Sequence, residues 1–207
     1  MAEHRQFLLD QVRAPYVLYL DDDLLLENDM FERLMRMILE QRCGFVGAAP
    51  IGLSYIGDVR LNQQEIEFWE EGVKPEDIRP HSPEWERHLL HNAANVFHVQ
   101  NNLRLTPRCQ RPYKIAWVGG CVLYDVRKLR KSGGYTFWRR LPGVHCGEDV
   151  LAQLSVMRRY GGCGVIPSGV FHLELTTTLP DRSVNAPEFL SDGFSDEKPG
   201  RNHGRIV

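Results

Sequence analysis

The chain has 207 residues, of which 43% are hydrophobic and 25% are charged, and its formal net charge is -2. This balance is typical of a soluble globular protein with one domain, and the bulk charge gives no reason to expect a nucleic-acid partner. No apolar run approaches the ~20 residues that span a bilayer, no signal peptide is recognisable, and the cysteines form no CxxC pair. We therefore expect reduced thiols and no transmembrane segment. The default location is the cytoplasm, and a peripheral position at the inner face of the membrane is the alternative.

The first predicted elements are a short helix over residues 3–12 and a strand at Tyr16–Leu20, with Pro15 between them. All five residues of the strand are apolar, and they include Tyr and Val, which favour β-structure. Such a run predicts a strand buried on both faces, as in a parallel sheet covered by helices.

Three acids, Asp21, Asp22 and Asp23, follow this strand directly. Open α/β sheets bind ligands at the carboxyl ends of their strands, and adjacent carboxylates there repel one another unless a cation or a proton neutralises them. A divalent metal site is the interpretation that we favour. The alternative is a solvated turn before a helix capped by Asn28, which accounts for one or two acids but does not require three.

A helix is predicted next, and Gly44 is expected to end it before a second strand at residues 45–49. Its apolar residues follow the spacing of one helical face. They are Phe31, Leu34, Met35 and Ile38.

Residues 51–112 give a weaker signal that prolines interrupt, and we expect an insertion or an acceptor-facing surface there. Within this region a short helix is predicted at residues 84–91 and a strand at residues 95–99. The histidines of the region have no convincing metal-ligand spacing, so they are expected to be solvated or hydrogen-bonded. They are His81, His88, His91 and His98.

Clearer patterns return after residue 112. Residues 176–207 contain few large apolar groups, and this composition predicts a poorly ordered tail. The predicted elements are a strand at residues 113–118 ending in Gly119 and Gly120, residues 123–129 leading into a helix closed by Gly133 and Gly134, an amphipathic helix from Glu148 to Gly161, and short strands at residues 165–166 and 170–173.

Three features in this order need a common explanation: the acids after the first strand, Gly147-Glu148-Asp149 at a helix start, and His172 in a late strand. Together with Trp117-Val118-Gly119-Gly120, they make the chain resemble the glycosyltransferase family 2 group with the GT-A fold. The resemblance covers roughly residues 3–175 and is weak in the middle. It implies an α/β domain over residues 1–175, with a mixed, mostly parallel, Rossmann-like sheet flanked by helices.

The resemblance also implies a role for the acids after the first strand, which match the DXD element of that family. Asp23 would coordinate Mg²⁺ or Mn²⁺ against the diphosphate of a nucleotide-sugar, with Asp21 near the ribose or the metal and Asp22 on the donor side. Hard carboxylate oxygens suit these cations, and the cation offsets charge on the departing nucleoside diphosphate. His172 resembles the late histidine that can complete the metal site, although a hydrogen-bonded strand residue is the alternative.

The pair Glu148-Asp149 resembles the carboxylate motif that activates the acceptor. A sugar hydroxyl is a poor nucleophile until its proton is taken, and a carboxylate within hydrogen-bond reach can take it. We favour Asp149 as the general base, with Glu148 orienting the acceptor or exchanging roles with it. Alternatively, both acids only complement the positive end of a helix.

Trp117, Gly119 and Gly120 resemble the loop beneath the donor sugar. An aromatic plane can stack on a sugar, and glycine lets the backbone approach a ligand closely. Packing of Trp117 in the core and a plain turn at the glycines are the alternatives.

The family places a nucleotide-binding βαβα portion before the DXD strand, whereas only about fifteen residues precede Tyr16 and a βαβ unit needs ~30. We therefore expect a truncated GT-A domain, an excised fragment, or a chain whose protein partner supplies the strands. The expected function is metal-dependent, inverting transfer from a UDP- or GDP-sugar to a glycan or other hydroxyl acceptor, with activity of this chain to be tested. The alternatives are a non-catalytic carbohydrate-binding or scaffold protein and a Mg²⁺-dependent phosphatase of the haloacid dehalogenase type. A calcium-binding EF-hand loop fits less well, because its spacing is absent.

Overall fold

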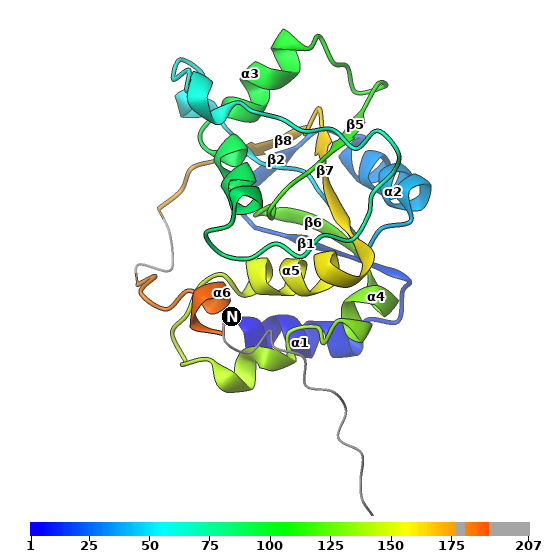
Figure 1. Ribbon diagram of the computed structural model, residues 1–207, viewed down its shortest axis with the longest axis vertical. Coiled ribbons are helices and arrows are strands. Elements are labelled where there is room, and N and C mark those ends of the chain that lie inside the picture. The colour runs from blue at the N-terminus through cyan, green and yellow to red at the C-terminus, as the bar shows by residue number, and fades with distance from the viewer. Residues whose placement is uncertain (177–180, 191–207) are drawn as a thin grey trace, which may run out of the picture.

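The computed structural model describes residues 1–176 and 181–190, which form a mixed α/β protein with two mixed sheets flanked by helices (Figure 1). Residues 177–180 and 191–207 of the predicted tail lie outside the described residues. The elements in chain order, with η marking a 3₁₀ helix, are α1 (Ala2–Gln11), β1 (Tyr16–Leu20), β2 (Leu24–Leu26), α2 (Met30–Gln41), β3 (Phe45–Gly47), β4 (Ile51–Gly52), η1 (Leu53–Tyr55), η2 (Leu61–Gln63), η3 (Pro83–His91), α3 (Asn95–Asn102), β5 (Arg111–Tyr113), β6 (Cys121–Asp125), α4 (Val126–Lys131), η4 (Thr136–Arg140), α5 (Glu148–Tyr160), β7 (Gly162–Ile166), β8 (Val170–His172) and α6 (Ala186–Phe189).

The larger sheet has its strands in the order β1-β6-β3-β7-β5. Strands β3 and β7 run parallel, whereas β6 is antiparallel to both β1 and β3, and β5 is antiparallel to β7. The prediction of a mostly parallel sheet is therefore wrong. An apolar run indicates that both faces of a strand are covered, but it carries no information about the direction of the neighbouring strands.

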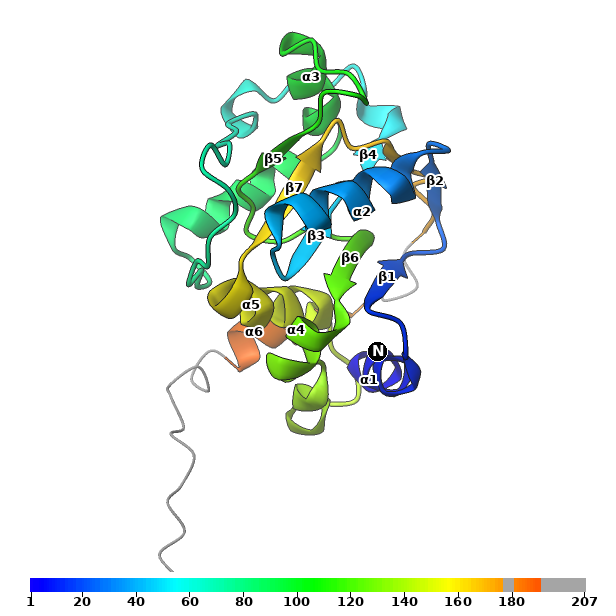
Figure 2. The ribbon, with the colours of Figure 1, turned by 90° about the vertical axis from the view of Figure 1, so that its right-hand side faces the viewer.

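Two hydrophobic layers cover the larger sheet. Successive residues of a strand point to opposite faces, so Phe45 packs with the buried residues of α5, and Val46 packs with those of α2. In Figure 2, β3 and β6 accordingly lie between α2 above and α5 below. The sheet is thus a middle layer, and the helices on its two sides fix the positions of the strand ends.

Strand β1 has the predicted bounds but lies at the edge of its sheet, paired with β6. Its residues are half-buried, and Leu20 is 44% exposed, so the prediction of a fully buried strand is wrong. Both faces are nevertheless packed: Tyr19 contacts the rings of Tyr124 and Tyr135 edge-on, and Tyr16 and Leu18 pack on the side of α2. Burial is incomplete because one long edge of the strand has no neighbour among the described residues.

A second sheet of short strands, in the order β2-β8-β4, lies beside the first. Strand β8 is antiparallel to β2 and parallel to β4, and Leu24 of β2 pairs with His172 of β8. The N–H group of Leu173 donates to the carbonyl of Asp23 at 2.9 Å. This pairing brings the third acid after β1 to the end of a strand that comes late in the chain.

Helix α2 differs from its prediction in its buried face and in its end. Met30, Leu34 and Ile38 are buried, whereas Phe31 is 52% exposed. The buried face is therefore rotated about the helix axis, away from Phe31 and toward Met30. The helix ends at Gln41, and the left-handed residue is Arg42 rather than Gly44.

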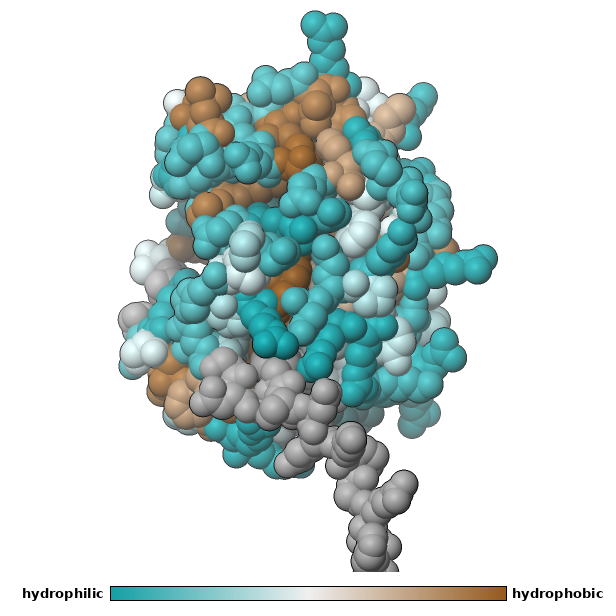
Figure 3. Space-filling view, viewed as in Figure 1, coloured by the Kyte–Doolittle hydropathy of each residue, from teal (hydrophilic) through white to brown (hydrophobic). Residues whose placement is uncertain are grey.

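The strand predicted within region 51–112 is absent, whereas β4 and the start of β5 lie at the two ends of the region. Residues 95–102 form helix α3 instead of a strand, because Val96 and Val99, three residues apart, share one buried helical face. The helix predicted at residues 84–91 is present as the 3₁₀ helix η3. Hydrophobic residues gather at the top of the face in Figure 3, over α3 and the loops beside it.

The segment after β5 is a loop rather than the predicted strand over residues 113–118. Strand β5 ends at Tyr113, and the buried side chain of Gln153 on α5 takes the place of a neighbouring strand. Its Oε1 accepts from the N–H group of Val118 at 2.8 Å, and its Nε2 donates to the carbonyl of the same residue at 2.7 Å. Helix α5 therefore sets the position of the glycines that follow Val118.

Part of the predicted tail is also packed. Residues 186–189 form α6, and Ala186 and Leu190 are buried against Leu151 of α5. The few apolar residues of this segment were enough to bury one short helix, although the composition predicted poor order. Within the described ranges, no helix combines the length and the apolar character needed to cross a membrane.

Replacing Gln153 with Ala should destabilise the fold more than most substitutions of a glutamine. The change leaves the buried N–H and carbonyl groups of Val118 without partners, and each group costs about 1–3 kcal/mol, so the free energy of unfolding should fall by roughly 2–5 kcal/mol. Urea unfolding measures it. Gln11→Ala, at the exposed end of α1, is the matched control and should change stability by about 0.5 kcal/mol or less. Equal effects of the two substitutions would contradict the anchoring role of Gln153.

Candidate functional site

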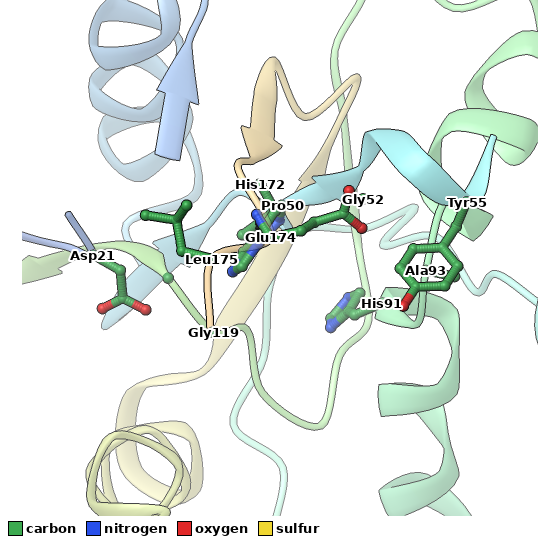
Figure 4. A pocket seen from close by; sticks show the side chains of 11 residues that line it. Asp21, Pro50, Gly52, Tyr55, His91, Ala93, Gly119, His172, Glu174 and Leu175 are labelled. Carbon is green, nitrogen blue, oxygen red and sulfur yellow. Dashed lines mark hydrogen bonds between the residues drawn. The ribbon is translucent and has the colours of Figure 1, made fainter. Parts of the chain in front are cut away.

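A pocket of about 500 Å³ opens where β1, β4 and β8 end (Figure 4). Asp21 and Tyr55 lie at its opposite ends, with His172 and Glu174 between them. Gly119 and Gly120 of the loop after β5 also line it. Several of the residues singled out from the sequence therefore contribute to one pocket, although they come from separate parts of the chain.

The glycines of this loop differ in their local geometry. Gly120 has a φ of +76°, and a Cβ atom added to it would lie 2.9 Å from Pro50 Cγ, so the backbone there requires glycine. The carbonyl of Gly120 accepts from the N–H group of Asp21 at 2.8 Å. A Cβ atom on Gly119 would meet no atom within 4 Å. Gly120 thus fixes the loop beside Asp21, and Gly119 leaves open space in the pocket.

Arg5 on α1 links the acids after β1 to those at the start of α5. Its Nε lies 3.1 Å from Glu148 Oε1, and one of its terminal nitrogens lies 3.8 Å from Asp21 Oδ1. The Glu148 side chain is 2% exposed, whereas that of Asp21 is 49% exposed. Partial burial raises the pKa of Asp21, and the charge of Arg5 opposes this shift. The guanidinium therefore stabilises carboxylates from two distant segments.

Asp149 and Arg5 line a smaller cavity, which shares Asp21 and Gly120 with the main pocket. Burial and the neighbouring carboxylate of Glu148 raise the pKa of Asp149 to about 6, although Arg5 acts in the opposite direction. Asp149 is the second residue of α5, and Gly147, which directly precedes the helix, has a φ of +72°. A carboxyl group whose pKa lies near neutrality can exchange a proton at physiological pH, which an ordinary solvated aspartate does less well.

Asp23 lies beside His172: Asp23 Oδ2 is 3.2 Å from His172 Nε2. The Nδ1 atom of His172 accepts from the backbone N–H group of Glu174 at 2.7 Å. A backbone N–H group can only donate, so Nδ1 carries no proton and the proton of the neutral ring is on Nε2. His172 therefore presents an N–H group to the Asp23 carboxylate.

The donor set decides which residues could hold a metal ion. The carboxylates of Asp21 and Asp23 offer the hard oxygen ligands that Mg²⁺ and Mn²⁺ prefer. His172 fits less well, because a metal-bound histidine normally donates a hydrogen bond from its other nitrogen, whereas Nδ1 accepts one here. Within residues 1–176 and 181–190, no group of three or more such side chains is already gathered as a metal cluster.

Among the sequence candidates, Trp117, Asp22, Asp23 and Glu148 line neither the main pocket nor the smaller cavity. Trp117 stacks on His88, with ring centroids 4.6 Å apart and planes inclined by 14°, and lies against Trp85 at 4.2 Å. This favours the packing interpretation of Trp117 over a donor-sugar platform. Asp22 is exposed, and its charge contributes to the raised pKa of Asp21.

Four residues of the site were not among the sequence candidates: Arg5, Tyr55, His91 and Glu174. His91 was expected to be solvated or hydrogen-bonded, and its Nε2 lies 3.0 Å from the hydroxyl of Tyr113. Burial lowers the pKa of His91 to about 4, so it contributes an uncharged side chain to the lining of the pocket. Glu174 follows the Val-Phe-His segment closely, and this nearness was the available signal. For Arg5 and Tyr55 the sequence offers no distinguishing pattern.

Comparisons with protein-family models, with curated proteins and with solved structures found no match. The geometry of the pocket and the chemistry of its side chains therefore carry the functional conclusion.

Opposite changes in stability should follow from neutralising the two adjacent acids. The pKa of Asp149 rises from 3.8 to about 6 on folding, so its ionised form opposes folding. This loss of stability is complete above about pH 6 and absent below about pH 4. At about pH 8, Asp149→Asn should raise the free energy of unfolding by roughly 1–3 kcal/mol. Glu148→Gln should lower it by about 1–3 kcal/mol, because it removes a charged partner of Arg5.

Urea unfolding at about pH 8 and about pH 4 measures both effects. The gain from Asp149→Asn should disappear at the lower pH. Destabilisation by Asp149→Asn at about pH 8 would show that the ionised carboxylate of Asp149 does not reduce the free energy of unfolding.

Proposed function

We propose that the chain is a glycosyltransferase that moves a sugar from a nucleotide-sugar to a hydroxyl acceptor at the pocket beside Asp21. The observation that carries this proposal is that Asp21 and Gly120 line both the main pocket, together with Gly119, and the smaller cavity that Asp149 lines. Asp23 joins them through its contact with His172, another residue of the main pocket. A loop with open backbone next to carboxylates from two elements can accommodate a polar donor and an acceptor hydroxyl together.

Asp149 is the general base of the proposed reaction. The acceptor oxygen forms a bond to the anomeric carbon, its proton passes to the Asp149 carboxylate, and the bond from that carbon to the nucleoside diphosphate breaks with its electron pair. Attack from the face opposite the leaving group inverts the anomeric centre. Burial of Asp149 and the nearby charge of Glu148 support this role, because they make Asp149 a stronger base than a solvated aspartate.

Glu148 and Arg5 position the base. Glu148 is the buried member of this pair, which joins α1 to α5 and therefore fixes the start of α5 relative to α1. Mg²⁺ or Mn²⁺ held by the carboxylates of Asp23 and Asp21 would supply positive charge that offsets the diphosphate. A UDP- or GDP-sugar is the proposed donor, and a glycan or another hydroxyl compound is the proposed acceptor.

Calorimetric titration with a panel of UDP- and GDP-sugars, with and without Mn²⁺, tests donor binding. We expect Mn²⁺-dependent binding that Asp23→Ala weakens at least tenfold, because that substitution removes a hard oxygen ligand. Asp22→Ala is the matched control, since Asp22 is more exposed than Asp23, whose carboxylate contacts His172, and it should retain the affinity within about threefold.

Two outcomes of this titration would contradict the proposal. The absence of binding by the folded chain would remove the donor site. Glycan binding without nucleotide-sugar binding would instead identify a non-catalytic carbohydrate-binding protein, and release of phosphate from small phosphoesters would identify a phosphatase.

Turnover should depend on the ionised form of Asp149. Because its pKa is about 6, kcat/KM should fall as the pH decreases through about 6, where the carboxylate becomes protonated and cannot take a proton. Asp149→Asn should lower kcat by about 10²–10⁴-fold and leave donor affinity within about threefold. Nucleoside diphosphate release measures turnover, with Asp22→Asn as the control. A donor affinity that falls as far as kcat would show that Asp149 binds the donor and is not the base.

A further inference from the structure

The hydrogen bond that His172 accepts defines what its other nitrogen can do. The N–H group of Glu174 lies 2.7 Å from His172 Nδ1, so that nitrogen must offer a lone pair. The doubly protonated ring has donors on both nitrogens and is incompatible with this contact. The neutral ring with its proton on Nε2 remains, and Nε2 is 3.2 Å from the Asp23 carboxylate.

Neighbouring contacts hold this polarity of the ring, with Nε2 as the donor and Nδ1 as the acceptor, in place. The backbone of Glu174 has a φ of +57°, and both oxygens of its carboxylate are bound by Ser54, at 2.9 Å from the N–H group and at 2.8 Å from the hydroxyl. The ring itself is placed by β8, where His172 pairs with Leu24 and Gly52. The contacts of the Glu174 carboxylate with Ser54, together with the strand pairing of His172, therefore fix the N–H group of Glu174 relative to the ring.

We propose that His172 is a positioning residue that donates from Nε2 to Asp23 and orients its carboxylate, and that His172 is not itself a ligand of a divalent cation. A histidine that binds a metal through Nε2 must have no proton there and normally donates from Nδ1. Here Nδ1 faces a donor, so metal binding through Nε2 would require breaking the contact with Glu174 or forming an imidazolate. Donation to Asp23 requires neither. The part of this proposal that concerns a cation rests on the proposed function, whereas the ring polarity does not.

The protonation pattern of the ring can be measured directly. In ¹⁵N NMR spectra of the chain with labelled histidine, Nδ1 of His172 should have the shift of an unprotonated nitrogen, and Nε2 that of a protonated nitrogen. Addition of Mg²⁺ should leave this pattern unchanged. A proton on Nδ1, or loss of the proton from Nε2 when Mg²⁺ is added, would overturn the proposal. His172→Gln identifies the resonances.

Mn²⁺ binding, followed by electron paramagnetic resonance, separates an orienting histidine from a ligating one. His172→Leu removes the donor and should weaken Mn²⁺ binding about tenfold, as loss of a hydrogen-bond partner of a ligand does. His172→Gln restores an N–H donor at about the distance of Nε2 and should return the affinity to within about threefold of the original. His4→Gln, at an exposed position of α1, is the control and should have no effect.

The same samples provide a spectroscopic readout that a general loss of structure would not produce. Electron spin echo modulation of bound Mn²⁺ should contain no signal from a directly coordinated imidazole nitrogen. Such a signal in the original chain, absent from His172→Gln, would overturn the proposal. Equal losses of affinity in His172→Gln and His172→Leu would do the same.

Failure of the proposed function gives a different result. If Asp23→Asn leaves Mn²⁺ binding unchanged, no cation binds at this carboxylate and the proposed metal requirement fails. The NMR measurement still decides the polarity of His172 in that case, because it needs neither a nucleotide nor a cation.

Discussion

The site depends on the position of one guanidinium group among carboxylates. Asp21, Glu148 and Asp149 come from the end of β1 and the start of α5, and their charges disfavour one another in a partly buried space. Arg5 contacts Glu148 at 3.1 Å, and its charge opposes the rise in the pKa of both aspartates. Its helix is tied to the fold by Arg130, which donates to the carbonyls of residues 9 and 12. The N-terminal helix is therefore part of the electrostatics of the pocket.

Helix α5 organises the opposite side of the site through two different interactions. Its first turn carries the adjacent acids, and Gln153, in the next turn, holds both polar groups of the Val118 backbone. The loop with Gly119 and Gly120 and the proposed base are thus fixed to the same helix. Because one rigid element carries both parts, their separation is set by helix geometry rather than by a flexible connection.

The sequence predicted the parts of this arrangement that depend on local patterns. Apolar runs and terminal signals located β1 and α5, and the position of acids after a strand and at a helix start indicated one site. His172 and Asp23 are brought together by the pairing of β2 with β8, which the sequence order made plausible but did not determine. The late histidine was placed beside the correct acid, but the polarity of its ring depends on a backbone N–H group that no sequence pattern reveals.

Other features depend on long-range packing and could not be predicted in this way. The edge position of β1 and the antiparallel direction of β6 follow from which strands meet, not from the composition of either strand. Residues 95–99 fit both a strand and a helix until Val96 and Val99 are seen to share one buried face. Arg5 has no special neighbours along the chain, and its importance arises from the acids that the fold brings to it.

The central claim is that the carboxylates after β1 and at the start of α5 surround a single binding site for a nucleotide and a cation. Diffraction at the manganese absorption edge, from crystals soaked with Mn²⁺ and either UDP or GDP, tests it most directly. The account predicts an anomalous peak beside the carboxylate of Asp23 and nucleotide density in the pocket between Asp21 and Glu174. A nucleotide bound on another face of the molecule, or a pocket that stays empty at saturating nucleotide, would contradict it.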